Sequence, residues 1–140
     1  MNLGGRNKPM ADDLIDLAQQ VLHQAYAPYS GFHVGAALRA ASGRVYIGCN
    51  VENASYGLAI CAERSALAAA VSAEGRQLQI VEVAVRANKV GHGPCGASPC
   101  GACRQALIEL GPDAVVHYLN PELKPVARSL SELLVDSFRL

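Results

Sequence analysis

The sequence predicts a single α/β domain in which three layers, αβα, are built around a mixed sheet of about five strands. Helical and strand-like segments alternate along the 140 residues, and such alternation is typical of a layered fold. Strand-like runs at residues 33–41 and 44–50 are joined by a short turn, so we expect them to pair as an antiparallel hairpin. A chain of this length fits one domain and can bury a substantial core.

The first predicted helix has an acidic start and one apolar stripe. Asp12 and Asp13 open it, where carboxylates suit the positive end of the helix dipole. Its apolar residues recur at helical intervals: Leu14, Leu17, Ala18, Val21, Leu22 and Ala25. Residues 27–31, Ala-Pro-Tyr-Ser-Gly, end the helix. The polar residues 1–10 are predicted to be a flexible tail, so we expect the domain to occupy residues 11–140.

The remaining elements follow the same alternation. Residues 51–57 have no clear period and are predicted to be an ordered loop, and residues 88–99 are a second loop because they are rich in Gly and Pro. Further strands are predicted at 80–87, 114–119 and 125–129. Further helices are predicted at 60–74, at 101–110, and from Ser129 or Ser131 to about Phe138.

The helix predicted at 60–74 has no polar face in its middle. Between Ser65 and Ala73 it carries no charge, and Gly75 closes it. A helix that is apolar on every side is expected to be buried on every side. It therefore lies beneath the sheet or forms part of a contact between subunits.

The balance of charge argues against a polyanionic partner. Twelve basic residues offset twelve acidic ones, whereas nucleic-acid binding depends on clustered Lys and Arg. No apolar stretch is long enough to span a bilayer, and the first ten residues lack the apolar core of a signal peptide. We therefore expect a cytoplasmic protein with five reduced cysteines and with neither nucleic acid nor membrane as a partner.

A C-x-x-C motif stands at the start of the helix predicted at 101–110. Cys100 and Cys103 follow Pro99, and the dipole and free N–H groups at a helix N-terminus favour thiolates. Taken alone, the motif fits a redox pair and half of a metal site about equally well. A thioredoxin-like pair would follow the first strand of a βαβ unit, whereas this pair comes late, after a long loop. Its position therefore favours a metal.

A third cysteine begins the uncharged helix. Three thiolates, from Cys61, Cys100 and Cys103, leave one of four tetrahedral zinc positions open, which is typical of a catalytic site. Glu63 lies within the same turn as Cys61 and is placed to move the proton of a water, although alone it would be an ordinary first-turn glutamate. Arg64 is expected to donate hydrogen bonds to the thiolates and to offset their charge. We therefore expect one Zn²⁺ per chain.

Longer segments around these residues resemble a known family. Cys61-Ala62-Glu63 together with Pro99-Cys100-x-x-Cys103 resembles the zinc deaminases of nucleosides and nucleobases. Four runs resemble the small cytidine deaminases in particular: Pro28-Tyr29-Ser30-x-Phe32-x-Val34-Gly35-Ala36-Ala37-Leu38, Gly48-Cys49-Asn50-Val51-Glu52-Asn53-Ala54-Ser55-Tyr56-Gly57-Leu58, Ile60-Cys61-Ala62-Glu63-Arg64 and Pro99-Cys100-Gly101-Ala102-Cys103-Arg104-Gln105. The likeness extends from the first helix nearly to the C-terminus.

The resemblance implies hydrolytic deamination of cytidine and deoxycytidine to uridine and deoxyuridine, with release of ammonia, in pyrimidine salvage. It makes Cys61, Cys100 and Cys103 the zinc ligands and Glu63 the proton shuttle. The substrate contacts that it implies are Phe32 beside the pyrimidine ring, Asn50 and Glu52 at the ribose hydroxyls, Ala54 and Tyr56 in a loop at a subunit interface, and Phe138, which closes a neighbouring subunit's site. Small family members are homotetramers, so the resemblance also implies a homotetramer with its sites at subunit interfaces.

Three features depart from the family's pattern. Leu133-Leu134-Val135 stands where Leu-Leu-Pro usually precedes the C-terminal aromatic residue, and Ala59 stands where Thr or a similar polar residue is common. Pro94-Cys95-Gly96-Ala97 imitates the start of the C-x-x-C motif five residues early but lacks the second cysteine. We therefore expect Cys95 to be a loop thiol.

Three other functions fit parts of the sequence. A deaminase of another aminopyrimidine, such as the antibiotic blasticidin, would share the metal motif, but the loop at 50–57 favours plain cytidine. An inactive, zinc-stabilised binding module would not need Glu63 beside an open metal position. A deaminase of cytidines within RNA or DNA is disfavoured by the balanced charge.

Overall fold

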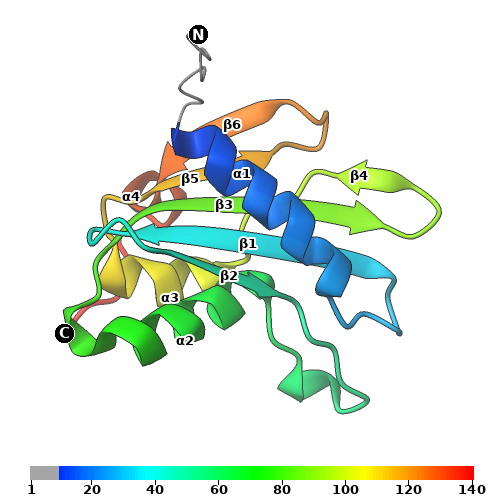
Figure 1. Ribbon diagram of the computed structural model, residues 1–140, viewed down its shortest axis with the longest axis horizontal. Coiled ribbons are helices and arrows are strands. Elements are labelled where there is room, and N and C mark those ends of the chain that lie inside the picture. The colour runs from blue at the N-terminus through cyan, green and yellow to red at the C-terminus, as the bar shows by residue number, and fades with distance from the viewer. Residues whose placement is uncertain (1–9) are drawn as a thin grey trace, which may run out of the picture.

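The computed structural model describes residues 10–140, in which one mixed sheet carries helices on both faces (Figure 1). The strands are β1 (Phe32–Ala40), β2 (Val45–Cys49), β3 (Ile80–Lys89), β4 (Gly93–Cys95), β5 (Val115–Leu119) and β6 (Pro125–Ser129). The α-helices are α1 (Met10–Val21), α2 (Ala62–Glu74), α3 (Gly101–Leu110) and α4 (Leu130–Leu133). The predicted layered α/β fold is confirmed, with six strands in place of about five.

The strands are ordered β2-β1-β3-β5-β6 across the sheet, and β4 pairs with the end of β3. β1 is antiparallel to β2, as the predicted hairpin requires, and also to β3. β5 runs parallel to β3, and β6 returns antiparallel to β5. The sequence did not predict β4, because its three residues include Gly93 and Pro94 and show no alternation. The expectation that Cys95 is a loop thiol is therefore wrong, since Cys95 ends this strand opposite Ala87.

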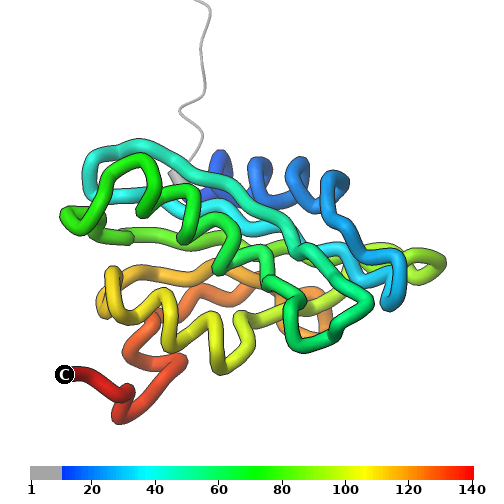
Figure 2. Tube along the Cα trace, turned by 90° about the horizontal axis from the view of Figure 1, so that it is seen from below, coloured from blue at the N-terminus to red at the C-terminus, as the bar shows by residue number. Residues whose placement is uncertain are grey.

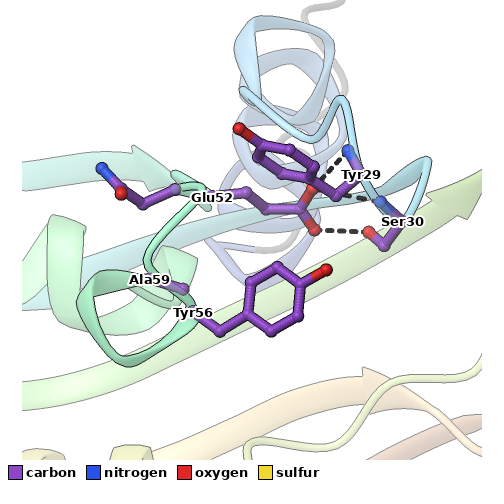
Figure 3. Close-up of a pocket in the computed structure, with 6 residues that line it drawn as sticks. Tyr29, Ser30, Glu52, Tyr56 and Ala59 are labelled. Atoms are coloured by element: carbon purple, nitrogen blue, oxygen red, sulfur yellow. Dashed lines mark hydrogen bonds between the residues drawn. The ribbon is translucent and has the colours of Figure 1, made fainter.

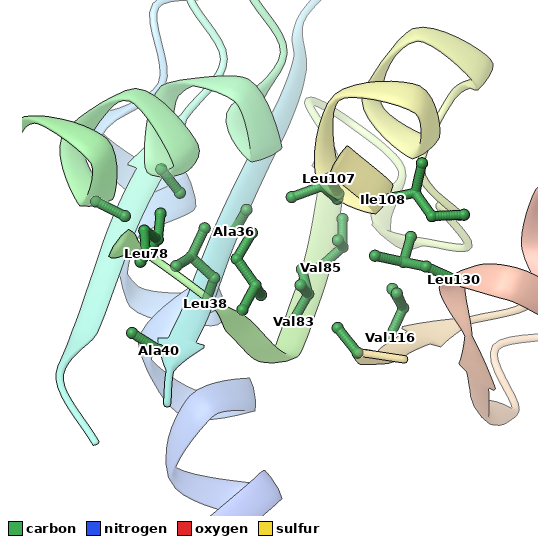
Figure 4. Close-up of a cluster of buried hydrophobic side chains, with 14 of the residues drawn as sticks. Ala36, Leu38, Ala40, Leu78, Val83, Val85, Leu107, Ile108, Val116 and Leu130 are labelled. Carbon is green, nitrogen blue, oxygen red and sulfur yellow. The ribbon is translucent and has the colours of Figure 1, made fainter. Parts of the chain in front are cut away.

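Alternate residues of the central strands face the two helical layers. In β1, Ala36 and Leu38 belong to the buried cluster beneath α2 and α3 (Figure 4). Ala37 belongs to the cluster beneath α1. β3 repeats the pattern, with Val85 in the first cluster and Ala84 in the second. Figure 2 shows α1 on the side of the sheet opposite to α2 and α3. The period of two along each strand thus produces the three layers.

A glycine sets the distance between α2 and the sheet. A Cβ added to Gly48 of β2 would lie 2.4 Å from the backbone N of Ala66 and 2.7 Å from the carbonyl O of Ala62. The backbone of α2 therefore rests directly on β2. This close approach holds the N-terminus of α2 near the N-terminus of α3, where Cys61 Sγ lies 3.8 Å from Cys100 Sγ.

The prediction that the uncharged helix is buried on every side is wrong for the single chain. α2 buries the face that carries Ala66 and Ala70 against the sheet. Its opposite face exposes Ala68, Ala69 and Val71, because no described element of the chain covers it. Of the two predicted environments, beneath the sheet or at a contact between subunits, the single chain provides the first, and only for one face of α2.

The last helix is shorter than predicted. Ser129 caps it with a side-chain oxygen, but the helix ends at Leu133 and does not reach Phe138. Arg104 Nη1 of α3 donates to the carbonyl of Leu133 at 2.7 Å, and Gln105 Nε2 donates to the carbonyl of Phe138 at 3.1 Å. These side chains of α3 bind the carbonyls and hold the chain end along α3 in a non-helical course.

The predicted flexible tail at 1–10 lies outside the described residues, except for Met10, which begins α1. The described part of α1 ends at Val21 and continues into the 3₁₀ turn Leu22–Gln24. None of the helices between residues 10 and 140 combines the length and the apolar character needed to cross a membrane.

Candidate active site and metal centre

Two helix N-termini meet at one end of the sheet, and each begins with a cysteine. Cys61 is the N-cap of α2 and Cys100 is the N-cap of α3, both with an extended backbone. Cys103 lies in the first turn of α3 and is fully buried. All three sulfurs are therefore at the positive ends of helix dipoles, where negative charge is stabilised.

The spacing of the three sulfurs fits a tetrahedral metal. Their Sγ atoms all lie within 4.8 Å of one another, and Cys61 Sγ is 3.8 Å from Cys100 Sγ. With Zn–S bonds of 2.3 Å, sulfurs at two tetrahedral positions are about 3.8 Å apart. Within residues 10–140 this is the one group of three or more potential ligands found this close together. The donor set of Cys61, Cys100 and Cys103 thus fits zinc with a fourth position free.

Hydrogen bonds among the thiols determine where negative charge forms before a metal binds. A hydrogen bond from Cys103 lowers the pKa of Cys61 to about 5, with a further hydrogen bond from Cys100 and the charge of Arg64 acting in the same direction. The hydrogen bond to Cys61 raises the pKa of Cys103, as do burial and the negative charge of Glu63. A metal ion held by all three sulfurs would bind them as thiolates, so binding would release protons.

Glu63 is a buried carboxyl group beside this cluster. Its side chain is 4% exposed, although charged residues are rarely buried without a partner. Burial raises the pKa of Glu63, and the negative charge of Cys61 raises it further. A raised pKa brings a carboxyl group closer to the range in which it can both accept and return a proton near neutral pH.

Arg64 brings a positive charge to the cluster but lacks one hydrogen bond. Its Nη2 donates weakly to the carbonyl of Ala59 at 3.4 Å. Its Nε is buried and has no hydrogen-bond partner within residues 10–140. A buried donor without a partner is costly, which favours an anionic group in front of it. The predicted hydrogen bonding from Arg64 to the sulfurs is present at Cys61, where a hydrogen bond from Arg64 and the charge of Arg64 both lower the pKa of the thiol.

A cavity of about 240 Å³ connects the sulfur cluster with several of the predicted substrate contacts. Its wall includes Cys61, Glu63, Cys100, Phe32, Asn50 and Glu52. The first three come from the N-termini of α2 and α3, whereas the others come from β1 and the segment after β2. An aromatic ring, an amide and a carboxylate therefore share one cavity with the candidate metal ligands.

Asn50 and Glu52 both hold the backbone around β1. Asn50 Oδ1 accepts from the backbone N–H of Val34 and its Nδ2 donates to the carbonyl of Phe32, both at 2.8 Å. Glu52 Oε1 accepts from the backbone N–H groups of Tyr29 and Ser30 at 3.0 and 3.1 Å (Figure 3). The hydrogen bond from the Ser30 hydroxyl is the main cause of the lowered pKa of Glu52.

Tyr56 lines a second cavity, of about 320 Å³, which shares Glu52 and Ala59 with the first. Its ring is 78% exposed and meets the ring of Tyr29 edge-on, with the ring centres 6.2 Å apart (Figure 3). Ala54 is exposed in the same loop and lines neither cavity.

Phe138 lies away from both cavities of its own chain. It lines a shallow pocket with Ile108 and Glu109 of α3, and its ring is 71% exposed. The structure therefore brings together Phe32, Asn50 and Glu52 near the sulfurs, but not Phe138.

Two residues that were not candidates from the sequence, Ser30 and Arg104, hold the site in place. Ser30 links Glu52 to the backbone of Phe32, since its Oγ accepts from the Phe32 N–H at 3.0 Å. Arg104 donates to the carbonyl of Pro99 at 2.8 Å and so fixes the segment that leads into Cys100. Both residues lie inside runs that resemble the cytidine deaminases, and this resemblance is the feature of the sequence that could have identified them as site residues.

Comparison with known proteins places this site in a family. The family model described as the cytidine and deoxycytidylate deaminase zinc-binding region matches residues 9–119. A cytidine deaminase of Halalkalibacterium halodurans is 48% identical over 126 residues, which cover 89% of this chain and 91% of the relative. A cytidine deaminase of Mycobacterium tuberculosis is 43% identical over 123 residues, covering 88% and 85% of the two chains.

A solved structure extends the likeness to three dimensions. The crystal structure of cytidine deaminase from Burkholderia pseudomallei superimposes with a TM-score of 0.80 at 45% sequence identity, covering 91% of this chain and 98% of that one. The matched zinc-binding region contains Cys61, Cys100 and Cys103, and this cluster accounts for one Zn²⁺ per chain. The chain therefore belongs to the family of zinc-dependent cytidine and deoxycytidylate deaminases.

Proposed function

We propose that this chain hydrolyses the 4-amino group of cytidine and deoxycytidine, releasing ammonia and leaving uridine or deoxyuridine. The observation that carries the proposal is the buried Glu63 beside three sulfurs with zinc spacing, in a cavity that also contains Asn50 and Glu52. The relatives named cytidine deaminase support it, because they match this chain over most of its length.

The proposed chemistry is proton transfer by Glu63. Zinc, when bound by Cys61, Cys100 and Cys103, lowers the pKa of a coordinated water to about 7 and so supplies hydroxide near neutral pH. Glu63 accepts the proton of the attacking water and delivers it to N3 of the pyrimidine as the oxygen bonds to C4. Glu63 then takes the remaining proton from the hydroxyl group added at C4 and delivers it to the amino group. The C4–N bond breaks as the C4 carbonyl forms, and ammonia leaves.

The proposed substrate contacts line the same cavity as the sulfurs of Cys61 and Cys100. Phe32 packs beside the pyrimidine ring, and Asn50 and Glu52 bind the sugar hydroxyls through one amide and one carboxylate. Arg64 offsets the negative charge that three thiolates and Glu63 place around one metal ion. The shared cavity of these groups supports the assignment.

We also propose that the working unit is a homotetramer with sites completed by neighbouring chains. In the single chain Tyr56 and Phe138 are exposed aromatic residues, and Val71 is exposed on the uncharged outer face of α2. Contiguous exposed apolar patches mark interaction surfaces, and Ala68, Ala69 and Val71 are exposed together on this face of α2. Ala54 and Tyr56 belong to the loop, and Phe138 to the chain end, that would reach a neighbouring site.

We further propose that the protein acts in the cytoplasm and has a role in pyrimidine salvage. The five cysteines are all free thiols in the structure, and a reducing compartment keeps metal-ligating thiols available.

Ammonia release from purified, zinc-loaded protein tests the proposed substrate. The set of compounds is cytidine, deoxycytidine, cytosine, cytidine monophosphate and a short cytidine-containing oligonucleotide. We expect turnover of the two nucleosides and little turnover of the free base, the monophosphate or the oligonucleotide. Preferred turnover of the oligonucleotide, or none of the nucleosides, would overturn the proposal.

A further inference from the structure

Ser30 lies between two groups of the candidate substrate site. Its Oγ donates to Glu52 Oε2 at 2.5 Å (Figure 3). The same Oγ accepts from the backbone N–H of Phe32 at 3.0 Å. One hydroxyl therefore connects the carboxylate proposed to bind the sugar with the residue proposed to pack beside the base. The Ser30 hydroxyl is the side-chain group that holds Oε2 of Glu52, whereas backbone N–H groups hold Oε1.

The hydrogen bonds already made by Glu52 leave room for one more. An ionised carboxylate offers about four acceptor positions. Oε1 accepts two backbone N–H groups, from Tyr29 and Ser30, and Oε2 accepts the Ser30 hydroxyl. One acceptor position remains, on Oε2.

Asn50 is committed in a similar way. Its Oδ1 accepts from Val34 N–H and one of its two Nδ2 protons goes to the carbonyl of Phe32. One N–H donor of Asn50 remains, and Asn50 lines the same cavity as Glu52. A remaining donor and a remaining acceptor are the complement of a single hydroxyl, which donates once and accepts once.

We propose that Ser30 is a positioning residue: its hydroxyl fixes Glu52 so that the carboxylate and Asn50 together bind one hydroxyl of the sugar. The proposal rests on the proposed deaminase function. Ser30 itself touches no substrate in this arrangement and acts through Glu52 and Phe32.

The chain contains a matched control for this arrangement. Ser42 Oγ also donates to a glutamate, Glu74 Oε2, at 3.0 Å and also accepts from the backbone N–H two residues later, that of Arg44, at 3.3 Å. Ser42 lies in the β1–β2 turn and lines neither of the two cavities described above. Ser30→Ala and Ser42→Ala therefore remove the same pair of hydrogen bonds inside and outside the site.

The test measures KM and kcat for cytidine and for 2′,3′-dideoxycytidine with the assembled, zinc-loaded protein. We expect Ser30→Ala to raise KM for cytidine about fivefold and to leave kcat within about twofold. The variant should bind the sugar hydroxyl more weakly, whereas Glu63 and the chemical step are unchanged. With 2′,3′-dideoxycytidine, which lacks the sugar hydroxyls that Glu52 would bind, the effect of Ser30→Ala on KM should disappear. Ser42→Ala should change neither constant, and Ser30→Thr, which keeps the hydroxyl, should restore KM.

The pH dependence of KM gives a second readout. Removing the Ser30 hydroxyl removes the main influence that lowers the pKa of Glu52. As the pH is lowered, Glu52 should therefore become protonated at a higher pH in Ser30→Ala than in the wild type, and KM should begin to rise at that higher pH. An equal loss with both nucleosides, or an unchanged KM for cytidine, would overturn the positioning role. Absence of turnover in the zinc-loaded wild type would instead contradict the proposed function, so the two failures are distinguishable.

Discussion

A buried carboxyl group next to metal ligands can serve as a proton carrier or as a helix-cap residue. Replacing the carboxyl group by a neutral amide distinguishes these two roles. Glu63→Gln keeps the shape of the side chain but cannot accept and return a proton. We expect kcat to fall by about 10⁴ or more, the upper end for one acid–base group, because Glu63 is proposed to serve several transfers. Zinc content should remain at one ion per chain, measured by metal analysis of the same sample.

Glu122→Gln is the control, since Glu122 is exposed and lines neither cavity of the site. Near wild-type turnover of Glu63→Gln would make Glu63 a cap residue of α2.

Two cysteines with similar sequence surroundings should behave differently when replaced. Cys100 belongs to the sulfur cluster, whereas Cys95 lies in β4 and donates to the carbonyl of Gly93 at 3.4 Å. Cys100→Ala should therefore lose zinc and lower the melting temperature, and Cys95→Ala should do neither, as read by metal analysis and thermal unfolding. Loss of zinc from Cys95→Ala would show that the wrong Pro-Cys-Gly-Ala motif was assigned to the metal.

At the scale of elements, the contact between β2 and α2 should be intolerant of one methyl group. In Gly48→Ala the new Cβ would meet the backbone of α2, which cannot move aside as a side chain can. We expect the free energy of unfolding to fall by at least about 2 kcal/mol. Displacement of the N-terminus of α2 should also weaken zinc binding, because Cys61 would move away from α3. Both effects are measurable by denaturant unfolding and by competition with a chelator.

Gly57→Ala provides the comparison, because a Cβ there meets no atom within 4 Å. Equal losses in the two variants would mean that the close approach of α2 to β2 contributes nothing of its own.

The other end of α2 is held by Glu74, which makes part of the stability depend on pH. The hydrogen bond from Tyr46 lowers the pKa of Glu74 from its ordinary value of 4.5, and Ser42 and the charge of Arg44 act in the same direction. A pKa that is lower in the folded state stabilises the fold above pH 4.5, and this contribution is lost as the pH falls through the folded value.

Glu74→Gln should therefore lower the melting temperature near neutral pH and have a progressively smaller effect below pH 4.5. Melting curves across this range test it, with the exposed Glu122→Gln as control. A deficit that stays constant down to acidic pH would contradict the role assigned to the Glu74 charge.

Elements with strong local signals were predicted closely, and those that depend on distant contacts were not. The structure forms α3 and β6 at the predicted residues, 101–110 and 125–129, because their flanking Gly and Pro residues punctuate the sequence. β4 exists because β3 extends to Lys89 and offers it an edge, which no local pattern reveals. The end of α4 depends on hydrogen bonds from α3, a contact between residues about thirty positions apart.

The site shows the same division. Two short motifs predicted which cysteines would meet, since both stand at helix starts, and the structure brings their sulfurs together. The Ser30–Glu52 hydrogen bond joins residues 22 positions apart, and a serine or a glutamate in the sequence does not by itself predict such a contact. The composition of α2 likewise could not distinguish burial under the sheet from burial by another chain.

For the whole molecule, the outer face of α2 and the aromatic residues around the second cavity are surfaces that a single chain leaves uncovered. Tyr29 and Tyr56 meet edge-on at the surface, and Val71 is exposed on α2. Association would remove these apolar groups from water, and at about 25 cal/mol per Å² the gain favours a stable assembly. Sedimentation should give a mass near four times 14.7 kDa, and a monomer at assay concentration with full activity would contradict the shared site.

Mixed assemblies test directly whether one site draws on two chains. In the proposed tetramer, Glu63 acts in its own chain's cavity and Phe138 acts in a neighbour's, which agrees with the distance of Phe138 from its own cavity. A mixture of inactive Glu63→Gln with weakened Phe138→Ala chains, refolded together, should regain activity above either parent, because some sites then combine an intact Glu63 with an intact Phe138. A mixture of Glu63→Gln with Cys100→Ala is the control. Both substitutions affect a chain's own cavity, so no site in this mixture contains both Glu63 and Cys100, and we expect no gain in activity. Ammonia release that does not exceed the more active parent in the first mixture would mean that Phe138 closes no neighbouring site.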